Sequence, residues 1–334
     1  MMKKFVCFLL AVCMLLCVFT GCTASDPEPT QAPEPAEETT TIKVGALTGP
    51  TAMGMVKLMD DSDKGTSVNK YEFQLQSEAS AFVAALAKGE IDIAAVPANL
   101  ASVIYNNTNG GVKLLAINTL GVLYIVERGD SVNSFADLSG KTLYATGEGA
   151  APEYALRYLL KENGLDGDNA PAIQWCADTT EALSYIASDE NAIAMLPQPF
   201  VTAAQAKVDG LRVALSLNDE WAKLDNGSAM VTGVVVCRSE FAEKYPQQLE
   251  KFMQEYESSV KYVQENTEDA AALIGNYEIV KAPIAQKALP YCNITFITGT
   301  EMKADMESYL SVLNDMNPKA IGGKLPGADF YYGA

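Results

Sequence analysis

The 334-residue sequence contains no histidine. This absence excludes Ser-His-Asp and Cys-His catalysis, and it removes the commonest general base and the commonest transition-metal ligand. A zinc site would then need clusters of cysteines or carboxylates, and the sequence shows none. We therefore expect a protein that is not an enzyme and that has neither a metal site nor a cofactor.

Positive charge is also scarce. The chain has 24 lysines and arginines against 42 aspartates and glutamates, which gives a formal net charge of −18. Such a charge repels nucleic acid and anionic lipid surfaces, so neither is an expected partner. We interpret the acidic excess as a source of solubility.

Cysteine is sparse outside the N-terminal region. Four of the seven cysteines lie in the first 22 residues, and the other three form no CxxC pair. These three are Cys176, Cys237 and Cys292. An odd set cannot pair completely within one chain, so we predict buried free thiols. One disulfide stays open as an alternative, because an exported protein meets oxidising conditions.

No apolar run has the length of a membrane-spanning helix, which is about 20 residues. The longest one, from Phe5 to Phe19, follows Lys3 and Lys4 and ends at Thr20-Gly21-Cys22. This pattern predicts a secretory signal over residues 1–21. It resembles the bacterial lipoprotein signal, although Phe19 stands where leucine is usual, and the resemblance implies that Cys22 is lipidated. The alternative is a plain cleaved signal.

Residues 22–41 combine this cysteine with a segment that has almost no apolar side chains. The stretch TASDPEPTQAPEPAEETTT, from Thr23 to Thr41, holds four prolines and five acidic residues. It cannot bury enough surface to fold, and proline and like charges keep it extended. We interpret it as a disordered tether, and a tail without a role would have the same composition.

One pattern occurs twice in the remaining chain. A strand at 42–47 and another at 142–145 are each followed by a glycine-containing loop and a helix. Four residues also recur at an offset of one hundred: Glu90, Ile93, Ala94 and Pro97 match Glu190, Ile193, Ala194 and Pro197. We predict an α/β protein of two similar lobes with mostly parallel sheets. The alternative is one larger α/β sheet.

The segments 116–126 and 230–236 are apolar and suit strands that cross between such lobes. In open α/β sheets, ligands bind beyond the carboxyl ends of strands, where loops enter helices. Both predicted lobes have such loops, so we expect the ligand cleft between them.

Several segments carry a family resemblance. They are IKVGALTGPTAMGM (42–55), EIDIAAVPANLAS (90–102), SVNSFADLSGKTLYA (131–145) and MVTGVVVCRSEFAEKYP (230–246). Together with the lipoprotein-like signal and the tether, they resemble solute-binding proteins of ABC importers with the type II periplasmic binding fold. The most similar group binds sulfonates, nitrate or the pyrimidine precursor of thiamine. The resemblance extends from Ile42 to Tyr332.

The resemblance implies a function and a domain plan. Lobe 1 would comprise residues 42–125 plus 237–334, lobe 2 would comprise residues 126–236, and the two would close on the ligand about a hinge. The protein would be a monomer outside the cytoplasm, anchored by lipid to the cell membrane. It would capture a small molecule and deliver it to the membrane permease.

The resemblance also implies which residues hold the ligand. They lie in loops that lead into helices or at strand ends: Thr48, Pro50, Thr51, Met53, Asn99, Thr119, Thr146, Gly147, Glu148, Gln198 and Thr232. The alternative for each of these residues is a purely structural role. Threonine often caps a helix, glycine can simply permit a turn, and Met55 in particular is expected in the core.

The loops carry little charge. None of the four arginines lies in them, which disfavours an amino acid held by a bidentate arginine. Glu148 would repel an anion. We therefore expect a neutral or weakly cationic heteroaromatic solute, with a sulfonate or similar oxyanion held by helix dipoles as the second choice. Two other functions stay open: an enzyme of cofactor synthesis that uses Glu148, Glu153 and Tyr154, and a ligand sensor for a membrane receptor.

Overall fold

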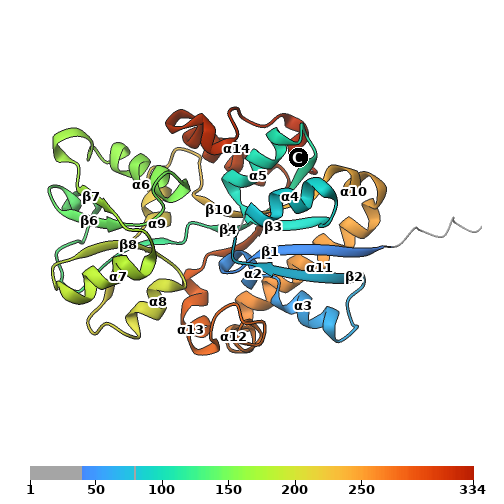
Figure 1. The fold of residues 1–334 in the computed structure, drawn as a ribbon, viewed down its shortest axis with the longest axis horizontal. Coiled ribbons are helices and arrows are strands. Elements are labelled where there is room, and N and C mark those ends of the chain that lie inside the picture. The colour runs from blue at the N-terminus through green and yellow to red at the C-terminus, as the bar shows by residue number, and fades with distance from the viewer. Residues whose placement is uncertain (1–39, 79) are drawn as a thin grey trace, which may run out of the picture. The chain divides into compact units, whose positions relative to one another are not determined.

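Eleven strands form two sheets in the computed structural model, which describes residues 40–78 and 80–334 (Figure 1). The signal segment, Cys22 and the tether up to residue 39 lie outside the described residues, so their predictions are not addressed by the structure. Within the described part of the chain, no helix is long and apolar enough to cross a membrane.

The first sheet has the strand order β11-β4-β10-β3-β1-β2. Its strands are β1 (Thr41–Leu47), β2 (Lys70–Gln76), β3 (Ile93–Pro97), β4 (Val112–Leu120), β10 (Val231–Arg238) and β11 (Ile294–Ile297). The central strand β3 is buried along Ile93–Val96 because helices cover both faces of the sheet.

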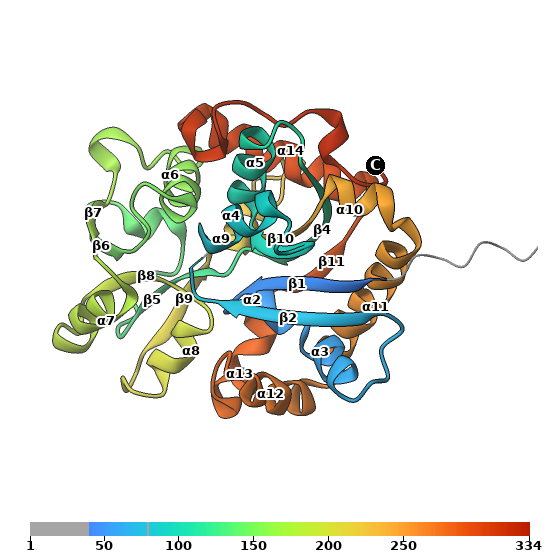
Figure 2. The same ribbon diagram turned by 45° about the vertical axis from the view of Figure 1, so that its right-hand side comes forward.

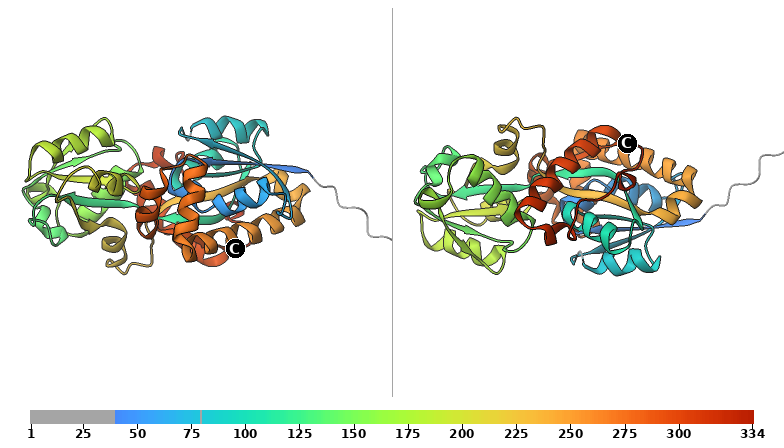
Figure 3. Two further views of the ribbon diagram at one scale, coloured as in Figure 1. Left: turned by 90° about the horizontal axis from the view of Figure 1, so that it is seen from below. Right: turned by 90° about the horizontal axis from the view of Figure 1, so that it is seen from above.

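Two groups of helices cover the first sheet (Figures 1 and 2). One face is covered by α4 (Ser80–Lys88), α5 (Ala98–Asn107) and α14 (Gly299–Met316). The other face is covered by α2 (Pro50–Met53), α3 (Val56–Asp63), α11 (Pro246–Glu265), α12 (Thr267–Asn276) and α13 (Ala282–Ala288). The short α10 (Ser239–Lys244) precedes α11 and packs into the same core. The view from below in Figure 3 shows the orange helices of residues 267–288 in front of this sheet.

The second sheet has the order β7-β6-β8-β5-β9. Its strands are β5 (Leu123–Glu127), β6 (Thr142–Ala145), β7 (Ala172–Trp175), β8 (Ile193–Pro197) and β9 (Arg212–Ser216). Helices α6 (Ala151–Glu162) and α9 (Leu217–Ala222) pack on one face. Helices α7 (Thr179–Ser188) and α8 (Phe200–Gln205) pack on the other face.

The twofold use of one pattern is confirmed. The order β2-β1-β3-β10 in the first sheet matches β7-β6-β8-β5 in the second. The register agrees as well, because Val44 pairs with Ile93 in one sheet and Leu143 pairs with Ile193 in the other. The α/β class is confirmed, and the alternative of one larger sheet is wrong.

The predicted majority of parallel strands is wrong. Four of the nine strand pairings are parallel and five are antiparallel, so both sheets are mixed. The reason is the path of the chain between the sheets. The chain leaves the first sheet at the end of β4 and re-enters it at the start of β10, which pairs with β4. Since one strand leaves the sheet where the other enters it, β4 and β10 are antiparallel.

Sheet membership changes between β4 and β5, at residues 121–122, and again between β9 and β10. Residues 123–216 thus supply all strands of the second sheet. The expected lobe limits at 125 and 237 stay a prediction, since residues 40–334 belong to one unit of the chain.

The three cysteines of the described chain are buried free thiols, as predicted, and the alternative of a disulfide among them is not found. Burial raises the pKa of the Cys237 and Cys292 thiols to about 12 in each case. A thiol with so high a pKa holds almost no thiolate at neutral pH and is chemically inert.

Candidate ligand-binding site

A cavity of about 330 Å³ lies where strands of both sheets end. The loops after β1, β3, β6 and β8, the crossing at residues 122–123 and the start of β10 all contribute to it. Its lining residues are Leu47, Thr48, Pro50, Thr51, Pro97, Asn99, Val122, Leu123, Thr146, Ala150, Ala151, Pro152, Pro197, Met230, Val231, Thr232 and Tyr309. The position agrees with the rule that ligands bind beyond the carboxyl ends of strands.

Two of the predicted threonines, Thr48 and Thr51, line the cavity. Their hydroxyl groups already donate hydrogen bonds to backbone carbonyls. The Oγ1 of Thr48 donates to the carbonyl of Gln76 at 3.1 Å, and the Oγ1 of Thr51 donates to the carbonyl of Leu47 at 2.6 Å. A hydroxyl has one proton to donate and two lone pairs. Toward a ligand these two groups therefore act as acceptors.

Asn99, in the first turn of α5, also lines the cavity. Its amide Nδ2 donates to the carbonyl of Ala320 at 3.1 Å. The side chain therefore ties α5 to the C-terminal segment. Its side-chain oxygen accepts no hydrogen bond from the residues that the structure describes, and it is available to a ligand that donates.

Three hydroxyl groups of the lining form no hydrogen bond with any described residue. They belong to Thr146 after β6, Thr232 in β10 and Tyr309 in α14. The Tyr309 side chain is only 2% exposed, and burial raises its pKa, so the phenol keeps its proton. Each of these hydroxyls has one proton that it can donate to a ligand. These three groups are the free donors that the cavity offers to a ligand.

Three predicted residues do not line the cavity, because their side chains are buried in the protein core. Met53 is fully buried among apolar side chains between α2 and the first sheet. Thr119 is fully buried and donates to Oδ1 of Asn118 at 3.2 Å. Gln198 is 2% exposed, and its Oε1 accepts from the backbone N–H and the hydroxyl of Thr202 at the start of α8.

Two further predicted residues form the turn beside the cavity. Gly147 has a φ of 89°, and a Cβ there would lie 2.8 Å from Cγ of Pro152, so glycine is required for the turn. Glu148 is exposed and does not line the cavity. The repulsion of anions that we expected from Glu148 therefore does not act within the lining itself.

Most of the apolar lining carries no signal that is visible in the sequence. In the sequence, Pro97 and Pro197 stand out only as members of the pattern that recurs at an offset of one hundred, although both residues line the cavity. Tyr309 lies in a long amphipathic helix, and its buried position is typical of a core residue. Only the packing of α14 against the first sheet places it at the cavity, so no local pattern could have indicated it.

No lining residue of this cavity carries a charge. Two candidates for acid–base chemistry lie close by in sequence but are engaged elsewhere. The Glu153 carboxylate accepts from the backbone N–H of Gly149 at 2.6 Å and from Nε of Arg157 at 2.6 Å. Burial alone would raise the pKa of Glu153, but these two donors outweigh it and hold the pKa below its ordinary value. The Tyr154 hydroxyl donates to the carbonyl of Gly149 at 3.0 Å.

Residues 58–283 match the family described as "ABC transporter, phosphonate, periplasmic substrate-binding protein". Since this match covers more than half of the sequence, the chain belongs to that family of substrate-binding components of ABC transporters. The two sheets that meet at one cavity agree with this membership. In a comparison with curated proteins, no match was found.

Solved structures confirm the periplasmic-binding-protein fold. An ABC transporter protein of Parabacteroides distasonis is 24% identical, with a TM-score of 0.73 over 87% of this chain and 98% of that chain. The aliphatic sulphonate binding protein SsuA of Escherichia coli is 16% identical, with a TM-score of 0.66 over 87% and 93%. The alkanesulfonate-binding protein SsuA of Xanthomonas axonopodis pv. citri, bound to MOPS, is 12% identical, with a TM-score of 0.60 over 87% and 96%. At these identities the likeness concerns the fold.

The general prediction of a solute-binding component of an ABC importer is therefore confirmed. The narrower assignment to the group that binds sulfonates, nitrate or the thiamine pyrimidine precursor stays a prediction, as does the role in ligand binding of each named residue.

Proposed function

We propose that the 330 Å³ cavity captures a small organic solute that has an apolar or aromatic body, a polar group that accepts hydrogen bonds, and at most one negative charge. The observation that carries this proposal is the combination of an uncharged lining with three unpaired hydroxyl donors. The proline, valine, leucine and methionine side chains of the lining suit the apolar body. A dianion would lose its hydration without gaining a cationic partner, which is costly.

A heteroaromatic solute such as a thiamine pyrimidine precursor fits these requirements, because ring nitrogens accept hydrogen bonds. A sulfonate is the second candidate. It is supported by helices α5 and α6, whose first turns contribute Asn99 and Ala151 to the lining. The amino end of a helix carries partial positive charge and stabilises a single negative charge nearby.

A matched ligand series tests the charge limit. Thermal shifts would be measured with benzamide, benzenesulfonate and phenylphosphonate, which share one ring, and with an aminopyrimidine. A ligand at one hundred times its Kd stabilises the folded state by about 2.7 kcal/mol. We expect the neutral or singly charged compounds to raise the melting temperature more than the phosphonate does. A phosphonate that binds tightest at a pH where it is a dianion would contradict the proposal.

We propose that the solute leaves the protein chemically unchanged, for delivery to the permease. Support comes from the uncharged lining and from Glu153 and Tyr154, whose side chains hold the Gly149 turn. One ligand is expected per monomeric chain. Calorimetry gives the stoichiometry, light scattering gives the oligomeric state, and mass spectrometry of the recovered ligand tests the chemistry. A converted ligand would favour the enzyme alternative.

We also propose that Cys22 carries the lipid anchor, outside the cytoplasm. The support is the Thr20-Gly21-Cys22 sequence after the apolar run. Cys22→Ala should abolish labelling by a radioactive fatty acid, whereas the matched control Cys17→Ala, inside the apolar run, should keep it. Labelling of the Cys22→Ala protein would show that the anchor lies elsewhere.

A further inference from the structure

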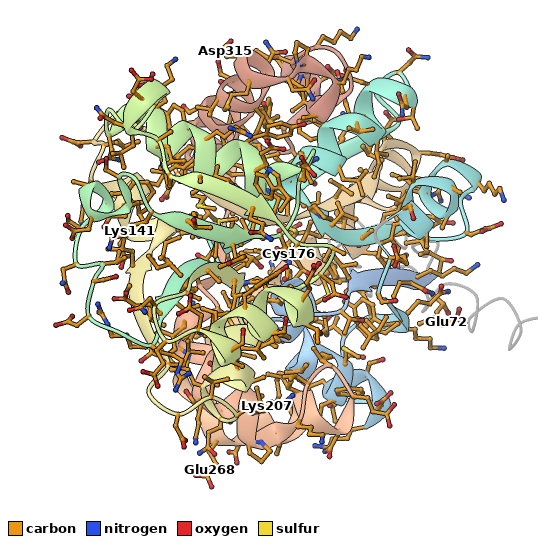
Figure 4. The ribbon with its side chains drawn as sticks, turned by 60° about the vertical axis from the view of Figure 1, so that its left-hand side comes forward. Glu72, Lys141, Cys176, Lys207, Glu268 and Asp315 are labelled. Atoms are coloured by element: carbon orange, nitrogen blue, oxygen red, sulfur yellow. The ribbon has the colours of Figure 1, made fainter. Side chains whose placement is uncertain are left out.

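Asn317, the residue after α14, connects two elements that line the ligand cavity. Helix α14 covers the first sheet, and Asn317 at its end reaches α6, which packs on the second sheet. The Nδ2 of Asn317 donates a hydrogen bond to the hydroxyl of Tyr154 in α6 at 2.7 Å. Figure 4 shows Asp315, in the last turn of α14, at the outer edge of the molecule. The Asn317 side chain therefore joins a helix of the first sheet to a helix of the second.

On the side of the second sheet, the Tyr154 hydroxyl holds the turn that precedes α6. It donates to the carbonyl of Gly149 at 3.0 Å, and the N–H of Gly149 donates to the Glu153 carboxylate at 2.6 Å. Gly149 has a φ of 72°, and the backbone freedom of glycine means that the turn alone does not fix its own position. Side chains of α6 fix it instead. The residues of this turn and of the start of α6 that line the cavity are Thr146, Ala150, Ala151 and Pro152.

On the side of the first sheet, the same amide holds a segment that contacts α5. The Oδ1 of Asn317 accepts from the backbone N–H of Lys319 at 3.1 Å and so caps the short 3₁₀ helix η4 (Pro318–Ile321). Within η4, the Ala320 carbonyl accepts from the amide of Asn99 at 3.1 Å, and Asn99 lines the cavity from α5. One amide group therefore connects the Gly149 turn with the α5 wall of the cavity.

The direction of each hydrogen bond in this chain is determined. A tyrosine hydroxyl has one proton, and Tyr154 gives it to the Gly149 carbonyl, so toward Asn317 it can only accept. The Asn317 nitrogen must then face Tyr154, which leaves its oxygen for the N–H of Lys319. The reversed amide would lose both bonds. The site thus requires a donor and an acceptor on one short side chain, as asparagine provides.

We propose that Asn317 is a positioning residue of the ligand cavity: it holds the Gly149 turn against the α5 wall and thereby slows the release of the solute. This inference rests on the proposed function, because it concerns how the same cavity retains its ligand. Without the bond from Asn317 to Tyr154, the turn is held by α6 alone and opens more often. Changes of this kind act mainly on the dissociation rate.

The first test is hydrogen exchange, measured by mass spectrometry on the full chain without ligand. Asn317→Ser keeps a side-chain oxygen that can cap η4 but is too short to reach Tyr154. We expect amides of residues 147–154 to exchange about two- to tenfold faster, as for one lost hydrogen bond, with η4 and α5 unchanged. Asn317→Ala also removes the cap, so it should speed exchange in η4 as well. Wild-type exchange of residues 147–154 in both variants would overturn the proposal.

The second test measures association and dissociation rates by stopped flow, with benzenesulfonate and an aminopyrimidine as probes. Asn317→Ser should raise the dissociation rate about two- to tenfold and leave the association rate nearly unchanged. Asp315→Asn, an exposed change in the last turn of α14 (Figure 4), is the control and should release the probe at the wild-type rate. An equal effect in Asp315→Asn, or an unchanged dissociation rate in Asn317→Ser, would refute the positioning role.

A double-mutant cycle tests whether Asn317 acts through Tyr154. Tyr154→Phe removes the bonds to Asn317 and to Gly149 together, so adding Asn317→Ser should accelerate dissociation no further. Independent, multiplying effects of the two substitutions would overturn the proposed connection. If neither probe binds the wild type, the proposed function fails, and the exchange of residues 147–154 still decides whether Asn317 positions the turn.

Discussion

Pro97 and Pro197 occupy equivalent positions in the two sheets, and both line the ligand cavity. Pro97 ends β3 opposite Gly233 of β10, and Pro197 ends β8 opposite Leu123 of β5. Each proline therefore stops a central strand at the point where the chain passes between the sheets. The repeated fold thereby brings two equivalent strand ends to one cavity, and this explains why its walls are apolar on both sides.

Tyr309→Phe tests the role of the Tyr309 hydroxyl directly. The substitution removes one oxygen from a side chain that forms no hydrogen bond within the described structure. We expect ligand affinity to fall about two- to tenfold, the effect of one lost hydrogen bond, without a loss of stability. Calorimetry and urea denaturation measure the two quantities. Tyr245→Phe, at the start of α11, is the matched control and should bind normally. Unchanged affinity in Tyr309→Phe would show that this hydroxyl does not contact the ligand.

The threonines of the cavity should separate into two classes. Thr146→Val and Thr232→Val remove unpaired hydroxyls, so they should weaken ligand binding and leave unfolding unchanged. Thr51→Val removes a 2.6 Å hydrogen bond to the Leu47 carbonyl and should lower the free energy of unfolding by about 0.5–1.5 kcal/mol. Comparison of binding and denaturation for the three variants checks this. If all three variants lost ligand affinity and stability in the same proportion, the division into paired and unpaired hydroxyls would be wrong.

The architecture could be predicted from the sequence because it depends on local patterns. The strand at 42–47, the loop after it and the match of Ile93 to Ile193 are all visible as spacing of apolar residues and glycines. The strand directions could not be predicted in this way. They depend on β10 returning beside β4, which is a pairing between segments more than one hundred residues apart.

The candidate site was predicted in part for the same reason. Thr48, Thr51, Asn99 and Thr146 follow strand ends, and the structure places all four at the cavity. Thr119 and Gln198 also lie near strand ends, yet their side chains turn to buried polar partners in their own lobes. The direction of a side chain at a strand end depends on the neighbouring elements, and the sequence alone does not contain that information.

Asn99 illustrates how the structure changes an expected result. From the sequence, Asn99→Ala is expected to weaken binding with little effect on stability. The structure shows that its amide holds the Ala320 carbonyl of the C-terminal segment at 3.1 Å. Asn99→Ala should therefore also lower the free energy of unfolding, by about 0.5–1.5 kcal/mol. Denaturation of the ligand-free protein measures this effect. Wild-type stability would mean that this hydrogen bond contributes nothing to the fold.

Gly233 is required where α2 approaches β10. A Cβ at this position would lie 2.4 Å from Cγ2 of Thr51 and 2.7 Å from Oδ1 of Asn118. Gly233→Ala should therefore displace Thr51 from the cavity, lower the free energy of unfolding by about 1–3 kcal/mol and weaken ligand binding. Gly129→Ala is the control, because the nearest atom to its added Cβ lies 3.9 Å away. Denaturation measures the stability of the two variants, and calorimetry measures their ligand affinity. Equal stability of Gly233→Ala and Gly129→Ala would contradict the close approach of Thr51 to Gly233.

Glu127 should give the stability of the protein a defined pH dependence. Its side chain is almost fully buried at the end of β5. Its carboxylate accepts from the Ser131 hydroxyl at 2.7 Å and the Val132 N–H at 3.0 Å, and it pairs with Arg212. Burial alone would raise the pKa of Glu127, but these donors outweigh it and hold the pKa below the ordinary value of 4.5.

Because the pKa of Glu127 is lower in the folded state, the unfolded state takes up the proton first as the pH falls. The stabilisation is therefore complete above about pH 5 and is lost as the pH falls through the folded-state pKa. At pH 7, Glu127→Gln should lower the free energy of unfolding by about 1–3 kcal/mol, because buried donors lose a charged acceptor. Urea denaturation from about pH 7 to about pH 3 should show the gap between wild type and variant narrowing below about pH 5. Glu190→Gln, whose carboxylate is 81% exposed beside Arg128, is the control and should follow the wild type throughout. A gap of constant size at every pH would mean that Glu127 stabilises the fold through its shape and not through its charge.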